Sequence, residues 1–265
     1  MKPVGLVILV LLIWGGVKLP WERRIGDERS DIVYGSEIPM SFELRETLGQ
    51  ELSFAALGGF RALAANYLWI KVTQAWEDQV WTRVRARADM AVTLQPRTLF
   101  FWENGAWHMA WNASVSVVKY AEEDKSEERK QFESRKWIDA GIDMLERGIR
   151  ANPEKYGLYL RMAELYWQRL EDYEMSAKYY RMALERPGAP TYTDRFIGYA
   201  LEKAGKYEES LAHWESLAAA PNFEERMQSH QQKVGENIEK LKQIIANGGP
   251  LEVDDSQKPT NAPAS

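Results

Sequence analysis

The stretch YEESLAHWESLAAAP, residues 207–221, decides the fold because its pattern occurs three times in the chain. The two related stretches are WIDAGIDMLERGIRANP, residues 137–153, and YEMSAKYYRMALERP, residues 173–187. Their closing prolines, Pro153, Pro187 and Pro221, follow one another at intervals of 34 residues. A period of this length indicates stacked helical units, each of which buries its apolar face against its neighbours.

Each stretch contains a set of three residues with the same spacing. A small residue is followed four positions later by a large one, and the third residue comes three positions after the large one. The sets are Gly141, Leu145 and Gly148; Ser176, Tyr180 and Ala183; and Ser210, Trp214 and Leu217. Spacings of four and three place all members of a set on one face of a helix. This face is therefore predicted to be where a neighbouring helix packs closely.

The repeated unit resembles the tetratricopeptide repeat, a helix–turn–helix unit of 34 residues. The copy that matches best runs from Thr191 to about Asn222, with Gly198 in the first helix and Gly205 and Tyr207 at the turn. The copy before it, from about Lys155 to Pro187, has one extra residue near Leu170 and lacks the turn glycine.

The match to the repeat is looser in the N-terminal part of residues 54–221. There a charged insert at about 120–132 separates one helix from its partner, which is predicted to start near Phe132. The resemblance implies an all-α, tetratricopeptide-like superhelix over residues 54–221. It also implies that the protein binds peptides or helices of partner proteins on its concave face.

The apolar stretch from Leu57 to Trp76 is predicted to form the first helix of the first unit. Small residues, among them Ala62 and Asn66, share one face, while Leu63, Tyr67 and Ile70 share another. Such a helix is typical of burial on several sides, although docking on a membrane or a membrane protein is an alternative. A second membrane span is disfavoured because Arg61 would lie inside it, at a cost of about 2.5–3.5 kcal/mol.

Residues 1–20 are predicted to form a single N-terminal transmembrane helix, with a cleaved signal peptide as the alternative. Residues 21–53 are interpreted as a tether, because they are charged and have few periodic apolar positions. The flanking Lys18, Arg23 and Arg24 favour a cytoplasmic domain by the positive-inside rule. The short basic start before an apolar run is typical of exported anchors instead, and we expect export.

Residues 222–247 are predicted to form a C-terminal capping helix. Asn222 and Glu225 have the spacing of a capping box at its start. Residues 248–265 have almost nothing to bury and are predicted to be a disordered tail.

Several classes of chemistry lack the residues they need. The chain has no cysteine, which excludes disulfides, thiolate metal sites and a cysteine nucleophile. The histidines, His108, His213 and His230, form no metal-binding motif, and no phosphate-binding loop or serine-nucleophile motif is present. We therefore expect no enzyme activity, no cofactor and no metal.

Residues 54–120 combine seven basic and four acidic side chains, a net charge of +3, with a high density of tryptophan. The candidate partner-binding residues in this part are Trp76, Trp81, Arg83, Arg87 and Arg97. Arg83 and Arg87, four residues apart, share a helix face and suit a carboxylate. Alternatively, the tryptophans fill helix interfaces and the arginines pair with Asp78, Asp89 and Glu103. The overall charge of −5 disfavours nucleic acid.

These features together predict a membrane-tethered scaffold, assembly factor or accessory subunit that binds a protein partner, which is itself expected to be membrane-associated. The alternative is a structural protein whose basic, tryptophan-rich half contacts lipid or the cell envelope.

Overall fold

The computed structural model describes residues 61–122, 124–221, 223 and 228–249, and every regular element in these ranges is helical. The predicted anchor, tether and capping box, the start of the Leu57–Trp76 helix and residues 250–265 of the tail lie outside the described residues. The elements are α4 (Arg61–Glu77), α5 (Trp81–Leu94), α6 (Leu99–Trp107), η1 (His108–Ala113), α7 (Ser114–Lys119), α8 (Glu127–Ala151), α9 (Tyr156–Leu165), η2 (Tyr166–Leu170), α10 (Tyr173–Leu184), α11 (Thr193–Lys203), α12 (Tyr207–Ala218) and α13 (Gln228–Ala246).

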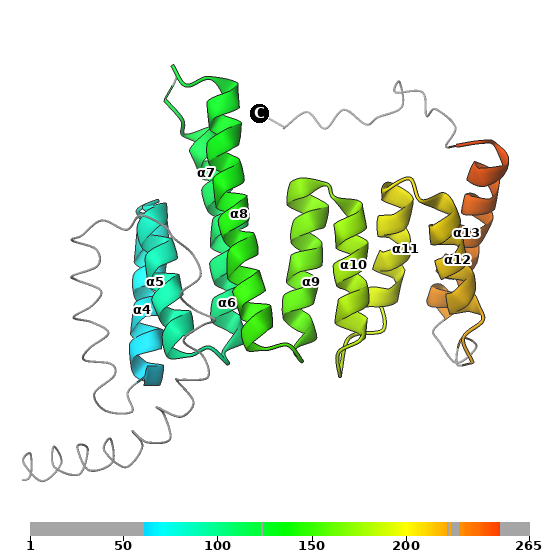
Figure 1. The fold of residues 1–265 in the computed structure, drawn as a ribbon, viewed down its shortest axis with the longest axis horizontal. Coiled ribbons are helices and arrows are strands. Elements are labelled where there is room, and N and C mark those ends of the chain that lie inside the picture. The colour runs from blue at the N-terminus through cyan, green and yellow to red at the C-terminus, as the bar shows by residue number, and fades with distance from the viewer. Residues whose placement is uncertain (1–60, 123, 222, 224–227, 250–265) are drawn as a thin grey trace, which may run out of the picture.

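The helices form hairpins that stand side by side in one elongated row (Figure 1). The first hairpin is α4–α5, and the second joins the continuous helix α6–η1–α7 to α8. The third joins α9–η2 to α10, the fourth is α11–α12, and α13 packs against α12 at the end of the row. Because each hairpin contacts only its neighbours, the described part of the chain is an all-α helical solenoid.

Glycines on α8 and α11 lie where neighbouring helices approach most closely. A Cβ atom added to Gly141 would lie 2.7 Å from the Cβ of Ala110, and one on Gly148 would lie 3.0 Å from the ring of Trp102. On α11, a Cβ atom at Gly198 would lie 2.4 Å from the indole of Trp214. Trp102 and Trp214 are completely buried, so these glycines provide the space that two large core side chains occupy.

Two buried serines join the helices of the third and fourth hairpins. The Ser210 hydroxyl donates to the carbonyl of Gly198 (2.8 Å), and the Ser176 hydroxyl donates to the carbonyl of Ala163 (2.9 Å). The sequence separation is 12 residues in the first pair and 13 in the second. The π-helical segment η2 lies between the residues of the longer pair and accommodates the extra residue near Leu170.

The turns inside three hairpins share a left-handed residue two positions before the second helix. Gly205 has φ 75°, Glu171 has φ 52° and Gln79 has φ 57°. Only glycine adopts this conformation without steric cost. The fourth hairpin has a glycine there, whereas Glu171 and Gln79 adopt the same conformation at a steric cost. Tyr207 follows the Gly205 turn as the first residue of α12 and packs against the cluster of Trp214, Val234 and Leu241.

The other predicted packing residues on α10 are also in the core. Tyr180 is buried and stacks on Phe196 of α11, with ring centroids 5.4 Å apart, and Ala183 is completely buried. Between α5 and α8, the buried Arg147 forms ion pairs with Asp89 (2.5 Å) and Asp143 (3.1 Å).

Two sequence-based expectations differ from the structure. Leu63, Tyr67 and Ile70 on α4 were expected to be buried but are exposed, Leu63 to 63%. Helix α4 instead packs through Ala65, Leu68, Val72 and Ala75, so only one side of it is in the described core.

Helix α8 begins at Glu127 rather than near Phe132. The Ser126 side chain accepts a hydrogen bond from the backbone amide of Arg129, and acidic residues occupy the first turn. A serine cap followed by Glu127 and Glu128 stabilises a helix start. Part of the charged insert is therefore helix.

Among the described residues, no helix combines the length and the hydrophobicity needed to cross a membrane.

Candidate protein-binding groove

Trp76 and Trp81, two of the predicted partner-binding residues, lie together at a hollow of about 570 Å³. This hollow lies where the α4–α5 turn meets η1 and α7, and Trp111, Val115 and Tyr120 also line it. The indole N–H of Trp81 donates to the hydroxyl of Ser116 (3.0 Å), which fixes one wall. Trp76 and Val115 are exposed and offer apolar surface to a ligand.

The predicted arginines do not line this hollow or either of the two described next. Arg87 donates to the backbone carbonyl of Lys71 (2.7 Å), and Arg97 donates to that of Ala151 (2.8 Å), so both join helices within the fold. Arg83 is exposed, and its side chain forms no hydrogen bond or ion pair with another described residue.

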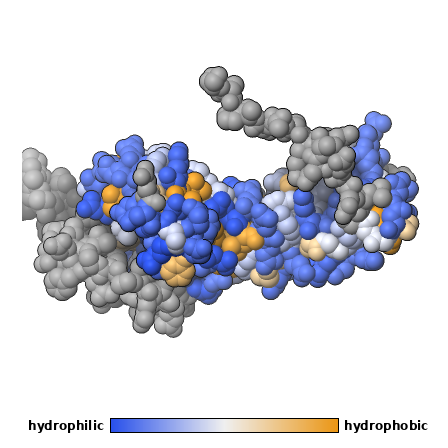
Figure 2. Space-filling view, turned by 90° about the horizontal axis from the view of Figure 1, so that it is seen from above, coloured by the Kyte–Doolittle hydropathy of each residue, from blue (hydrophilic) through white to orange (hydrophobic). Residues whose placement is uncertain are grey.

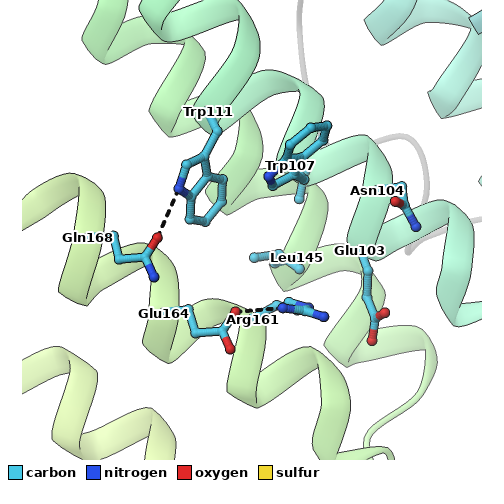
Figure 3. A pocket seen from close by; sticks show the side chains of 9 residues that line it. Glu103, Asn104, Trp107, Trp111, Leu145, Arg161, Glu164 and Gln168 are labelled. Carbon is cyan, nitrogen blue, oxygen red and sulfur yellow. Dashed lines mark hydrogen bonds and ion pairs between the residues drawn. The ribbon is translucent and has the colours of Figure 1, made fainter. Parts of the chain in front are cut away.

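A second, central hollow of about 500 Å³ lies between the first helices of the second and third hairpins (Figure 3). Leu145 and Ala106, both buried, form its floor. Trp107 and Trp111 stand on one side, and the opposite wall comes from α9–η2. The residues that line the hollow are Glu103, Asn104, Ala106, Trp107, Trp111, Leu145, Arg161, Glu164 and Gln168.

The three hollows adjoin one another, since neighbouring hollows share lining residues. Trp111 lines both the first and the central one. Glu103, Arg161 and Glu164 line both the central one and a third of about 350 Å³, which extends to Tyr192 before α11. We call the three together the groove. The face drawn in Figure 2 is mostly hydrophilic, and its hydrophobic residues form small separate patches.

The two π-helical segments hold the walls of the central hollow in a fixed relation. Arg169 of η2 donates from Nε to the carbonyl of Ala110 (2.9 Å) and from Nη2 to the hydroxyl of Ser114 (2.9 Å). The indole N–H of Trp111 in η1 donates to the side-chain oxygen of Gln168 in η2 (3.1 Å). A π-helical turn disturbs the regular backbone hydrogen bonds, and such turns are frequent at functional sites. Here both turns lie beside the groove.

The charges in the central hollow are unevenly matched. Arg161 donates to Glu164 at 2.7 Å, so these two charges are paired. The side chain of Glu103 forms no hydrogen bond and no ion pair within 4.0 Å with any described residue. Burial raises the pKa of the Glu103 carboxyl; Arg161 opposes this rise and Glu164 adds to it.

His108 lies among aromatic rings beside the groove. Its ring centroid is 5.3 Å from that of Trp107, 5.9 Å from that of Trp76 and 6.1 Å from that of Trp69. Burial lowers the pKa of His108 to about 4. The neutral ring accepts a hydrogen bond at Nδ1 from the Asn112 amide (3.0 Å), a contact that protonation would break.

The other histidines are held away from the groove. Nε2 of His213 lies 2.7 Å from the carbonyl of Asp194, and His230 contacts Phe223. In the described ranges, no group of three or more acidic or histidine side chains is arranged to hold a metal ion.

Sequence reasoning missed Glu103, Trp107, Trp111, Glu164 and Gln168 as groove residues, although their spacing was readable. The first three occur at intervals of four residues and therefore share one face of α6–η1. Arg161, Glu164 and Gln168 have spacings of three and four and share one face of α9–η2. What the spacing does not reveal is that these two faces lie opposite each other.

No model of a known protein family matches the sequence, and a search of curated proteins found no match.

Proposed function

We propose that this chain is a membrane-tethered helical-repeat protein, similar to tetratricopeptide-repeat proteins, that binds a protein partner in the groove. It would act as a scaffold, an assembly factor or an accessory subunit of a membrane-associated complex. The observation that carries the proposal is the groove itself: three adjoining hollows, two of them lined by tryptophans, of which Trp107 remains 46% exposed. Exposed aromatic side chains around a hollow are typical of protein-binding surfaces.

A repeated set of bonds between hairpins supports the helical-repeat part of the proposal. The carbonyl of Pro96 accepts hydrogen bonds from Trp102 and Asn152 of the second hairpin, and that of Pro153 accepts from Tyr159 and Arg186 of the third. Asn152 and Arg186 are 34 residues apart. The same junction is thus built twice from different side chains, which is what a repeat architecture requires.

The membrane anchor and the exported location rest on the sequence of residues 1–20. A protein attached to a bilayer through this segment meets membrane-associated partners at a raised effective concentration. This favours the proposed role in a membrane complex over a role as a free adaptor.

Affinity purification of the full-length protein from gently solubilised membranes tests this function. We expect a defined set of proteins to co-purify in fixed ratio. Trp107→Ala should reduce their recovery about tenfold or more, because a central aromatic residue commonly dominates a protein interface. Phe132→Ala is the matched control, since Phe132 is equally exposed but lies on α8 outside the groove. Equal recovery with both variants would contradict binding in the groove.

Contact with lipid or the cell envelope is a second candidate function, and the exposed face of α4 favours it. Leu63, Tyr67 and Ile70 form an apolar stripe there. In this case the purified protein would bring down no protein in fixed ratio. The chain lacking residues 1–30 would instead float with anionic liposomes, and charged substitutions in the stripe would abolish flotation.

A further inference from the structure

The carboxyl group of Glu103 is the one charge in the central hollow without an ionic partner among the described residues. It belongs to α6, and the charged groups that face it come from the third hairpin and the residues before it: Arg161, Glu164 and Lys155. Arg161 is engaged by Glu164, and Lys155 lines only the neighbouring hollow. The central hollow therefore carries an excess of one negative charge.

The space around this carboxyl is kept open by a glycine. A Cβ atom at Gly157 would lie 2.9 Å from Oε1 of Glu103, and any larger residue would displace the carboxyl. The tight fit leaves Glu103 partly desolvated but still at the surface of the hollow. A partly desolvated carboxylate binds a cation more strongly than one fully in water.

Two indole rings stand on the same helix face as Glu103, one and two turns further along. Trp107 is exposed, and the N–H of Trp111 is already used by Gln168. The N–H of Trp111 is therefore not available to a ligand, whereas the exposed ring of Trp107 is. Indole faces attract cations and also cover aliphatic chains.

We propose that the central hollow binds a lysine or arginine side chain of the partner protein. The charged end lies at Glu103, and the aliphatic part runs over Leu145 and beside Trp107. This inference rests on the proposed function and names the partner chemistry of the same groove. An acidic side chain fits less well, because the hollow already has a negative excess and its one cation is paired. An uncharged apolar side chain would leave Glu103 desolvated and unpaired.

Full-length protein labelled with 5-fluorotryptophan in detergent allows a direct test by fluorine NMR. The probes are the N-acetyl methylamides of lysine, arginine, norleucine and glutamate. Trp107→Phe and Trp111→Phe assign the two resonances. We expect the lysine and arginine probes to shift both resonances, and the norleucine and glutamate probes to shift them far less. Equal shifts with norleucine would overturn the proposal.

Glu103→Gln removes the charge and keeps the shape. We expect it to weaken lysine-probe binding by about threefold to tenfold, the range for a partly exposed to half-buried ion pair. Glu208→Gln, an exposed carboxyl on α12, is the matched control and should leave binding unchanged. Unchanged binding in Glu103→Gln would overturn the proposal. Thermal unfolding of Glu103→Gln is the control for misfolding. Its midpoint should be no lower than that of the wild type, because burial disfavours the ionised form of Glu103.

Co-purification with the same variants separates this inference from the proposed function. If Trp107→Ala loses the partner and Glu103→Gln retains it, the groove binds protein but not through a cation, and only the inference fails. If both variants retain the partner, the proposed function also fails. Loss of the partner with both variants, together with the charge-dependent probe shifts, supports both.

Discussion

Replacing Arg169 by alanine should loosen the groove without unfolding the solenoid. Arg169 of η2 donates to the carbonyl of Ala110 in η1 and to the hydroxyl of Ser114 in α7. The carbonyl of Ala110 keeps one donor in the variant, because Ser114 also donates to it at 2.6 Å. The variant therefore leaves no buried carbonyl without a partner. The stability it loses is that of the two Arg169 hydrogen bonds, which we call the bridge.

Two hydrogen bonds from a charged donor, discounted because Arg169 is partly exposed, give about 2 kcal/mol. A local opening free energy lower by this amount corresponds to about 30-fold faster amide exchange. The change should be confined to residues 108–119 and 166–170, because these segments are what the bridge joins.

Hydrogen–deuterium exchange with mass spectrometry measures this effect on the full-length protein. Arg186→Ala is the matched control, since Arg186 donates from Nε to the carbonyl of Pro153 (2.8 Å) at a different junction. It should leave exchange in η1 and η2 unchanged. If Arg169→Ala accelerates exchange in these segments less than about threefold, the reasoning is refuted. The bridge would then contribute less than about 0.7 kcal/mol.

Four further substitutions test the packing, the turns and the buried histidine. Gly198→Ala should lower the thermal unfolding midpoint at a cost of about 1–3 kcal/mol, because the new methyl would collide with Trp214. Gly235→Ala, a helical glycine with nothing within 4 Å, should instead raise it. Glu171→Gly should raise the free energy of unfolding by about 0.5 kcal/mol, measured as a higher urea midpoint, because it relieves a left-handed conformation. The wild type should lose stability as the pH falls from 6.5 to 4, because His108 binds a proton in the unfolded chain but not in the folded one. His108→Gln should lose less stability over the same range, which thermal unfolding measures.

Periodic features of the fold were predictable because they depend on short-range spacing. The 34-residue interval of the prolines and the register of Ser176 and Ser210 indicated a helical solenoid. The same register extends to the first hairpin, where Val84 and Ala88 stand three and seven positions after Trp81, as Ser210 and Trp214 do after Tyr207. That relation is visible only once the turn residues are aligned, because the insert before α8 breaks the period.

The roles of the arginines were not predictable from spacing. Arg87 and Arg97 were expected on a partner-binding face, but each donates to a backbone carbonyl of another helix. A long cationic side chain reaches several ångströms from its own helix, so its partner depends on which carbonyl the tertiary packing brings within reach. Sequence periodicity specifies the face of a helix but not what lies opposite it, and for the same reason the groove residues were missed.

The small–large–small pattern of α8 shapes the groove as well as the core. Gly148 lets Trp102 enter the interior completely, and Gly141 lets α8 approach Ala110 closely. Leu145, between the two glycines in the sequence, is completely buried and lines the central hollow, beside which Trp107 remains exposed. Of the two tryptophans of α6, Trp102 is thus in the core and Trp107 is at the groove. A smaller residue in place of Leu145 would deepen the central hollow rather than only weaken the core.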